Sequence, residues 1–103
     1  MDTQDKWIDR AALLGATVAT NMYRFWAKNP KDWPSFKQMK RIVVSMAEDQ
    51  VFIQMPTRVR SREEVLEAAR TSAAHTADAF NEVHRAARKT SREPSKPSKN
   101  PNP

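Results

Sequence analysis

The chain has 103 residues, with 18 Lys and Arg against 12 Asp and Glu, a formal charge of +6, a single Gly and no Cys. The lack of cysteine excludes disulfide scaffolds, thiolate zinc sites, iron–sulfur clusters and cysteine nucleophiles. One glycine is too few for a phosphate-binding or dinucleotide-binding loop and argues against hairpin-rich β folds. We therefore expect an all-α domain over residues 1–90, a three-helix bundle with a four-helix bundle as the alternative.

Residues 3–28 have the apolar spacing of one long helix, with Thr3 as a plausible N-cap. The predicted stripe consists of Trp7, Ala11, Leu14, Val18, Met22 and Phe25, widened by Ile8, Ala19 and Trp26. The most apolar run, residues 11–19, falls short of the about 20 residues that span a bilayer, and no basic segment precedes it as in a signal peptide. We expect no membrane contact and a cytoplasmic location.

A second helix is expected to follow Pro34, with Ser35 as its N-cap. Apolar residues recur at helical spacing to about residue 49, namely Phe36, Met39, Ile42, Val43 and Met46. Residues 50–55 fit either a continuation of this helix or a short extended segment, and so short a stretch shows no decisive periodicity. We favour the helix.

The third helix has the clearest start in the chain. Ser61-Arg-Glu-Glu64 matches a capping box, in which the Ser61 side chain accepts from the Glu64 amide and the Glu64 side chain returns to the Ser61 amide. The helix is predicted to end near Lys89. Its apolar face is rich in alanine, so a neighbouring helix can approach closely, near the low end of the roughly 8–10 Å interaxial range. The face consists of Val65, Ala69, Ala73, Ala77, Phe80, Val83, His84 and Ala87.

Residues 91–103 alternate proline with serine, lysine and asparagine and contain no apolar anchor. A segment that buries no apolar surface cannot offset the entropy lost on ordering. We predict a disordered basic tail.

Basic residues gather in two blocks, residues 24–62 and 85–103, separated by an acidic stretch over residues 63–84. Lys37, Lys40 and Arg41 share one side of the second helix because they are three and four positions apart. A patch of such residues suits a phosphate backbone, without base specificity. The candidate nucleic-acid-binding residues are Arg24, Lys28, Lys37, Lys40, Arg41, Arg58, Arg60 and Arg62. The alternative is that these charges only solvate helix faces or complement helix C-termini.

Five of the eight aromatic residues lie within residues 23–36, interleaved with bases. The pattern is typical of a base-stacking surface, but it equally fits packing of the turn between the first two helices. Trp33, in a proline-flanked loop, is the candidate for exposure. Trp26 and Trp33 are the candidate partner-binding residues.

No combination of residues indicates catalysis, a metal site or a cofactor. His75, Asp78 and Glu82 share a helical face, but no further strong ligand lies near them in the sequence, and no Ser or Thr has a base placed beside it. We expect a protein that is not an enzyme. Its acidic face is expected to meet a protein partner or the basic side of another copy.

No motif identifies a family. In size, helical character and charge the chain resembles the small helical subunits of CRISPR effector complexes, and also nucleoid- or ribosome-associated helical proteins and phage- or plasmid-encoded inhibitors. The resemblance implies a small basic subunit that contacts the backbone of RNA or DNA within a larger nucleoprotein assembly. The alternative is a protein-binding module or inhibitor that uses Trp26, Trp33 and the alanine-rich face.

Overall fold

The computed structural model describes the backbone of residues 3–95 and the side chains of residues 3–86 other than Asp32. These residues form α1 (Thr3–Lys28), the 3-10 turn η1 (Pro30–Asp32), α2 (Phe36–Gln54) and α3 (Arg62–Ser95). The all-α prediction is confirmed, and the part of the chain that is described contains three α-helices and no strand.

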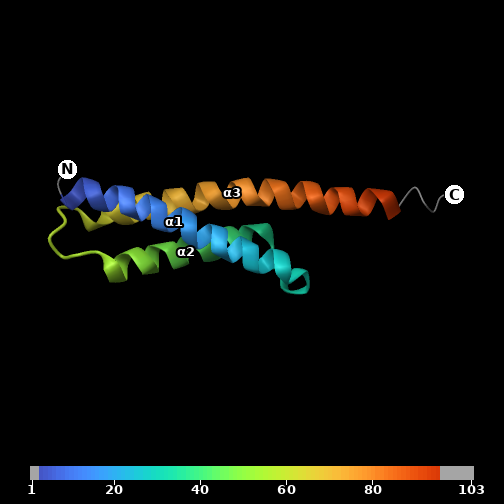
Figure 1. The fold of residues 1–103 in the computed structure, drawn as a ribbon, viewed down its shortest axis with the longest axis horizontal. Coiled ribbons are helices and arrows are strands. Elements are labelled where there is room, and N and C mark those ends of the chain that lie inside the picture. Colours follow the sequence, from blue (N-terminus) through green and yellow to red (C-terminus); the bar gives the residue numbers. More distant parts are fainter. Residues whose placement is uncertain (1–2, 96–103) are drawn as a thin grey trace.

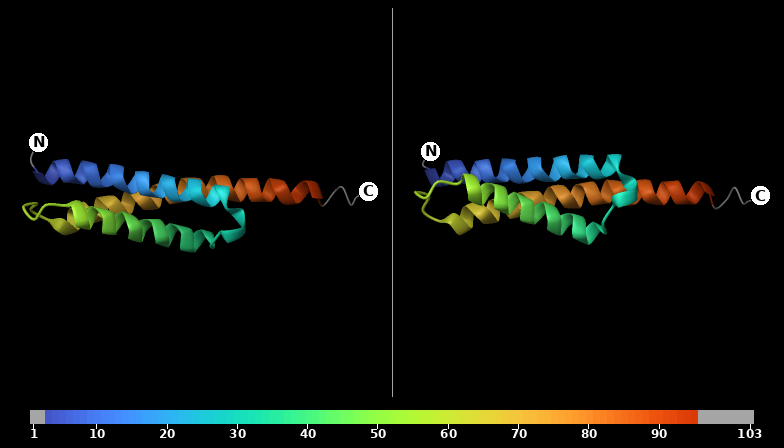
Figure 2. Two further views of the ribbon diagram at one scale, coloured as in Figure 1. Left: turned by 60° about the horizontal axis from the view of Figure 1, so that its bottom comes forward. Right: turned by 90° about the horizontal axis from the view of Figure 1, so that it is seen from below.

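The helices form an elongated bundle of 67 × 22 × 17 Å. α1 and α3 run in the same direction (Figure 1). α2, which comes between them in the sequence, runs in the opposite direction. One end of the bundle contains η1 and the helix turns on either side of it, residues 24–41, and we call it the η1 end. The opposite end contains residues 55–62 and the start of α1. α3 has 34 residues, about 51 Å at the usual helical rise, and its last turns extend past η1 (Figure 2).

α2 begins where the sequence predicts. The Gln38 amide donates to Ser35 Oγ at 3.1 Å and the Ser35 amide donates to Gln38 Oε1 at 3.3 Å, a complete capping box. The helix continues to Gln54, so the helical interpretation of residues 50–54 is confirmed. It ends at Met55, which has extended backbone and precedes Pro56.

α3 also begins where predicted, but its capping box is only half local. The Glu64 amide donates to Ser61 Oγ at 3.2 Å. The Ser61 amide does not bond Glu64; it donates to Gln4 Oε1 at 2.9 Å, while Gln4 Nε2 donates to the Ser61 carbonyl and to Glu64 Oε1. Gln4 is 2 % exposed. A buried glutamine of α1 therefore takes the place expected for Glu64 and joins the first turns of α1 and α3.

Small residues form the contact between α1 and α3. Gly15 is buried, and a Cβ placed on it would lie 2.5 Å from the carbonyl oxygen of Ala69 and 3.2 Å from the amide nitrogen of Ala73. Ser72 Oγ, one residue before Ala73, donates to a carbonyl of α1, that of Ala12. The close approach expected from the alanine face of α3 is confirmed at this seam.

The core stripe of α1 is rotated relative to the prediction. Its buried residues are Gln4, Trp7, Ala11, Gly15, Ala19, Tyr23 and Trp26. Leu14, Val18 and Met22 are only partly buried, and Phe25, predicted on the stripe, is 54 % exposed. The seam selects small residues because they allow the helices to meet, which leaves the larger aliphatic residues on its flank.

Two further predictions need correction. On α2, Ala47 is buried whereas Met46 is 38 % exposed. α3 ends at Ser95 rather than near Lys89, so the helix includes residues 91–95 of the segment that was predicted as a tail. A proline disfavours helical backbone at the residue before it and removes one donor, so Pro94 lies in the last turn of the helix and not in its interior. Residues 96–103 of the predicted tail lie outside the described residues.

Candidate nucleic-acid interface

One buried hydrogen-bond chain joins all three helices at the η1 end. Tyr23 Oη of α1 donates to Asn81 Oδ1 of α3 at 2.7 Å, and Asn81 Nδ2 donates to the Phe36 carbonyl at the start of α2 at 3.4 Å. Tyr23 is 1 % exposed, and burial raises the pKa of its phenol to about 12. The neutral phenol and the amide thus hold the first turn of α2 against the other two helices.

An aromatic cluster surrounds this chain. The Tyr23 ring meets the edge of Trp26 and stacks on Phe80, with centroids 5.1 Å apart in both pairs. Trp26 is 4 % exposed, so its ring presents no surface to a partner, contrary to its predicted partner-binding role. Trp33 is partly buried; its Nε1 donates to the Trp26 carbonyl and its ring lies 4.7 Å from that of His84. Both tryptophans therefore pack the turn between α1 and α2.

The basic residues on either side of this turn lie at the same end of the molecule, because η1 joins the last turn of α1 to the first turn of α2 (Figure 2). By sequence, residues 24–41 contain six bases and one acid, Asp32. Lys40 has 43 % of its side chain exposed. The other five bases are exposed, namely Arg24, Lys28, Lys31, Lys37 and Arg41.

Lys37, Lys40 and Arg41 line one open hollow of about 500 Å³ on α2, together with Val44, Ser45 and Glu48. The first turn of α2 contains no acidic residue. A base in the first turn of a helix, such as Lys37, faces the positive end of the helix dipole, which costs roughly a few tenths of a kcal/mol. Dipole complementarity therefore accounts for Lys28 in the last turn of α1, but not for this row.

Three of the candidate residues, Arg58, Arg60 and Arg62, lie elsewhere. They flank the start of α3 at the opposite end, separated from the row by the remaining 13 residues of α2, which span about 20 Å. Arg58 and Arg60 line a small hollow of about 210 Å³, and the Arg62 guanidinium lies 4.8 Å from the centre of the Phe52 ring. The eight predicted residues therefore form two separate groups, not one patch.

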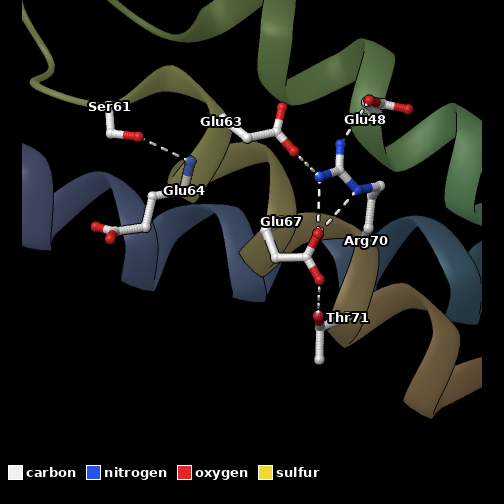
Figure 3. Close-up of polar contacts among 7 residues, drawn as sticks. All are labelled: Glu48, Ser61, Glu63, Glu64, Glu67, Arg70 and Thr71. Atoms are coloured by element: carbon white, nitrogen blue, oxygen red, sulfur yellow. Dashed lines mark hydrogen bonds and ion pairs between the residues drawn. The ribbon is translucent and has the colours of Figure 1, made fainter.

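Most of the acidic face of α3 is paired within the chain. Arg70 binds Glu48 of α2 and Glu67, each at 2.7 Å, and also Glu63 (Figure 3). The hydrogen bonds from Arg70 and Thr71 hold the pKa of Glu67 below its usual range, and those to Glu67 and Glu63 raise the pKa of Arg70.

Nearer the η1 end, Asp78 and Glu82, the two carboxylates that share a helical face with His75, also form ion pairs within the chain. Asp78 lies 3.0 Å from Lys40 Nζ. Glu82 lies 2.9 Å from Arg85. The basic surface that this acidic face was expected to meet is thus supplied in part by α2 of the same chain.

No family model, curated protein or solved structure matches this chain. Among the helices of residues 3–95, none combines the length and the apolar character that crossing a bilayer requires.

Proposed function

We propose that this protein binds the phosphate backbone of nucleic acid, without base specificity, through the basic residues of its η1 end. The observation that carries the proposal is the row of Lys37, Lys40 and Arg41 along one hollow at the start of α2. Arg24 and Lys28 add two exposed bases in the last two turns of α1, on the other side of η1. The proposal includes no catalytic step.

The row is suited to an external anion. Lys37 and Arg41 are exposed and form no ion pair with any side chain described for residues 3–86. Lys40 is paired with Asp78, but an exposed pair of this kind contributes only about 0–1 kcal/mol, so Lys40 can exchange the carboxylate for a phosphate. Each phosphate that a base neutralises releases condensed counterions, which drives binding at low salt.

The protein-binding alternative depends on surfaces that are already used within the chain. Trp26 is in the core, and Trp33 packs against His84. The alanine-rich face of α3 lies against α1 at Gly15. The basic row, in contrast, remains open.

The experiment compares two triple variants that remove the same charge from different ends. Fluorescence anisotropy would measure the affinity of labelled oligonucleotides of several sequences for three proteins. These are the wild type, the variant Lys37→Ala/Lys40→Ala/Arg41→Ala, and the control Arg58→Ala/Arg60→Ala/Arg62→Ala. The first variant should lose affinity by a similar factor for every sequence, and the control should lose much less. Equal losses in both would mean that net charge, not this row, determines binding. A wild type that binds none of the probes would contradict the proposal outright.

A further inference from the structure

Phe25 is an exposed aromatic residue at the η1 end, next in sequence to Arg24. It lies in the last two turns of α1, where Tyr23 and Trp26 occupy the core positions, and it is 54 % exposed. Its neighbours on the helix, Arg24 and Lys28, are also exposed.

The ring of Phe25 differs from the other aromatic rings near the surface. Phe52, exposed to a similar degree, lies under the guanidinium of Arg62, and Phe36 lies under that of Arg85 at 5.3 Å. Trp33 packs on His84. Phe25 has no such ring or cation contact with the side chains described for residues 3–86. Its face is available to a ligand.

An aromatic face among cations matches the chemistry of an unpaired strand. Proteins that bind single strands combine a positively charged surface for the backbone with aromatic side chains on which bases stack. A duplex keeps its bases stacked on one another and offers such a surface mainly its phosphates. An exposed phenyl ring is therefore of use to a single strand and of little use to a duplex.

We propose that the η1 end takes single-stranded nucleic acid, with one base stacked on Phe25 and the neighbouring phosphates held by Arg24 and Lys28 of α1 and by Lys37 and Arg41 of α2. This inference rests on the proposed function and adds the class of nucleic acid. The polyanion is chosen over an apolar partner because the bases on both sides of η1 complement its charge.

The test compares a labelled single strand of about 20 nucleotides, longer than the roughly 4–16 that one binding fold covers, with the matched duplex. Phe25→Ala should weaken single-strand binding roughly 5- to 150-fold, the loss expected for one stacked base, and leave duplex binding within about twofold. Phe25→Trp should retain single-strand binding because it keeps an aromatic face. Leu13→Ala is the matched control, since Leu13 is an exposed apolar residue of the same helix, 69 % exposed, outside the basic end.

Two outcomes would overturn the inference, and they differ in what they imply for the proposed function. If Phe25→Ala leaves single-strand binding unchanged, or weakens both probes equally, Phe25 does not stack a base. The proposed function then stands as long as the variant of Lys37, Lys40 and Arg41 still loses affinity for both probes. If the wild type binds neither probe, both the inference and the proposed function are wrong.

Discussion

Replacing Gly15 by alanine tests the packing of α1 against α3, because two effects oppose each other. In an unobstructed helix interior this change stabilises by about 0.5–1 kcal/mol, since alanine loses less backbone entropy on folding. In this seam the added Cβ would lie 2.5 Å from the Ala69 carbonyl oxygen, 3.2 Å from the Ala73 nitrogen and 3.3 Å from the Ala69 carbonyl carbon. All three are backbone atoms, so no side chain can rotate away and the helices themselves must separate.

The steric effect should prevail. Overpacking of a tight core costs about 1–3 kcal/mol, which leaves Gly15→Ala about 1 kcal/mol less stable than the wild type after the gain in helix propensity. For a domain of this size that lowers the melting temperature by about 4–8 °C. Urea and thermal denaturation, followed by far-ultraviolet circular dichroism, would measure the difference. Thr17→Ala, at an exposed position of the same helix, is the control and should be as stable as the wild type or slightly more so. A Gly15→Ala variant of equal or higher stability would refute the close contact.

Two further variants test the buried polar contacts. Tyr23→Phe should lower the free energy of unfolding by about 1–3 kcal/mol, because Asn81 Oδ1 loses its donor. Unfolded tyrosine ionises near pH 10, whereas the folded phenol keeps its proton up to a pKa of about 12. The wild type should therefore lose stability between those pH values relative to Tyr23→Phe. Denaturation at pH 9 and 11 would measure this, and equal losses of stability in the two proteins would count against it. Gln4→Leu should cost about 1–3 kcal/mol, because the Ser61 amide loses its acceptor and the Ser61 carbonyl keeps only the Val65 amide as a donor. Ser61→Ala should cost about 1 kcal/mol. A negligible cost for Gln4→Leu in the same denaturation assay would mean that the cap of α3 is local after all.

Helix starts were predictable because their determinants are local. Ser35 and Ser61 each cap an amide three residues ahead, and that spacing is visible in the sequence. The link from Gln4 to Ser61 and the link from Tyr23 to Asn81 join positions 57 and 58 residues apart. No helical periodicity contains such pairs, so they emerge only from the packing.

The register of the core was harder to predict than the existence of the helices. Hydrophobic size favours Phe25 over Tyr23 as a core residue, yet the structure buries Tyr23 and exposes Phe25. Close packing at Gly15 determines which side of α1 faces α3, and Asn81 gives the phenol a buried partner. The prediction placed Phe25 on the core stripe and named Trp26 for partner binding, whereas the structure exposes Phe25 and buries Trp26.

The candidate site was predictable in part. The shared face of Lys37, Lys40 and Arg41 follows from helical spacing, and these residues do line one hollow. The structure does not bring them together with Arg58, Arg60 and Arg62. The row lies at the start of α2 and the three arginines follow its end, so the two groups are at opposite ends of the bundle. The pairing of Lys40 with Asp78 also depends on how α2 lies against α3.

The salt dependence of nucleic-acid binding tests the central claim most directly. Anisotropy titrations over a range of salt concentrations would give the slope of log affinity against log salt for the wild type and for the two triple variants. Removing Lys37, Lys40 and Arg41 should make the slope shallower by about two to three units, because each lost phosphate contact removes roughly 0.7–0.9. Removing Arg58, Arg60 and Arg62 should leave the slope close to that of the wild type. An unchanged slope after loss of the α2 row, or an equal flattening in the arginine control, would contradict phosphate binding at the η1 end.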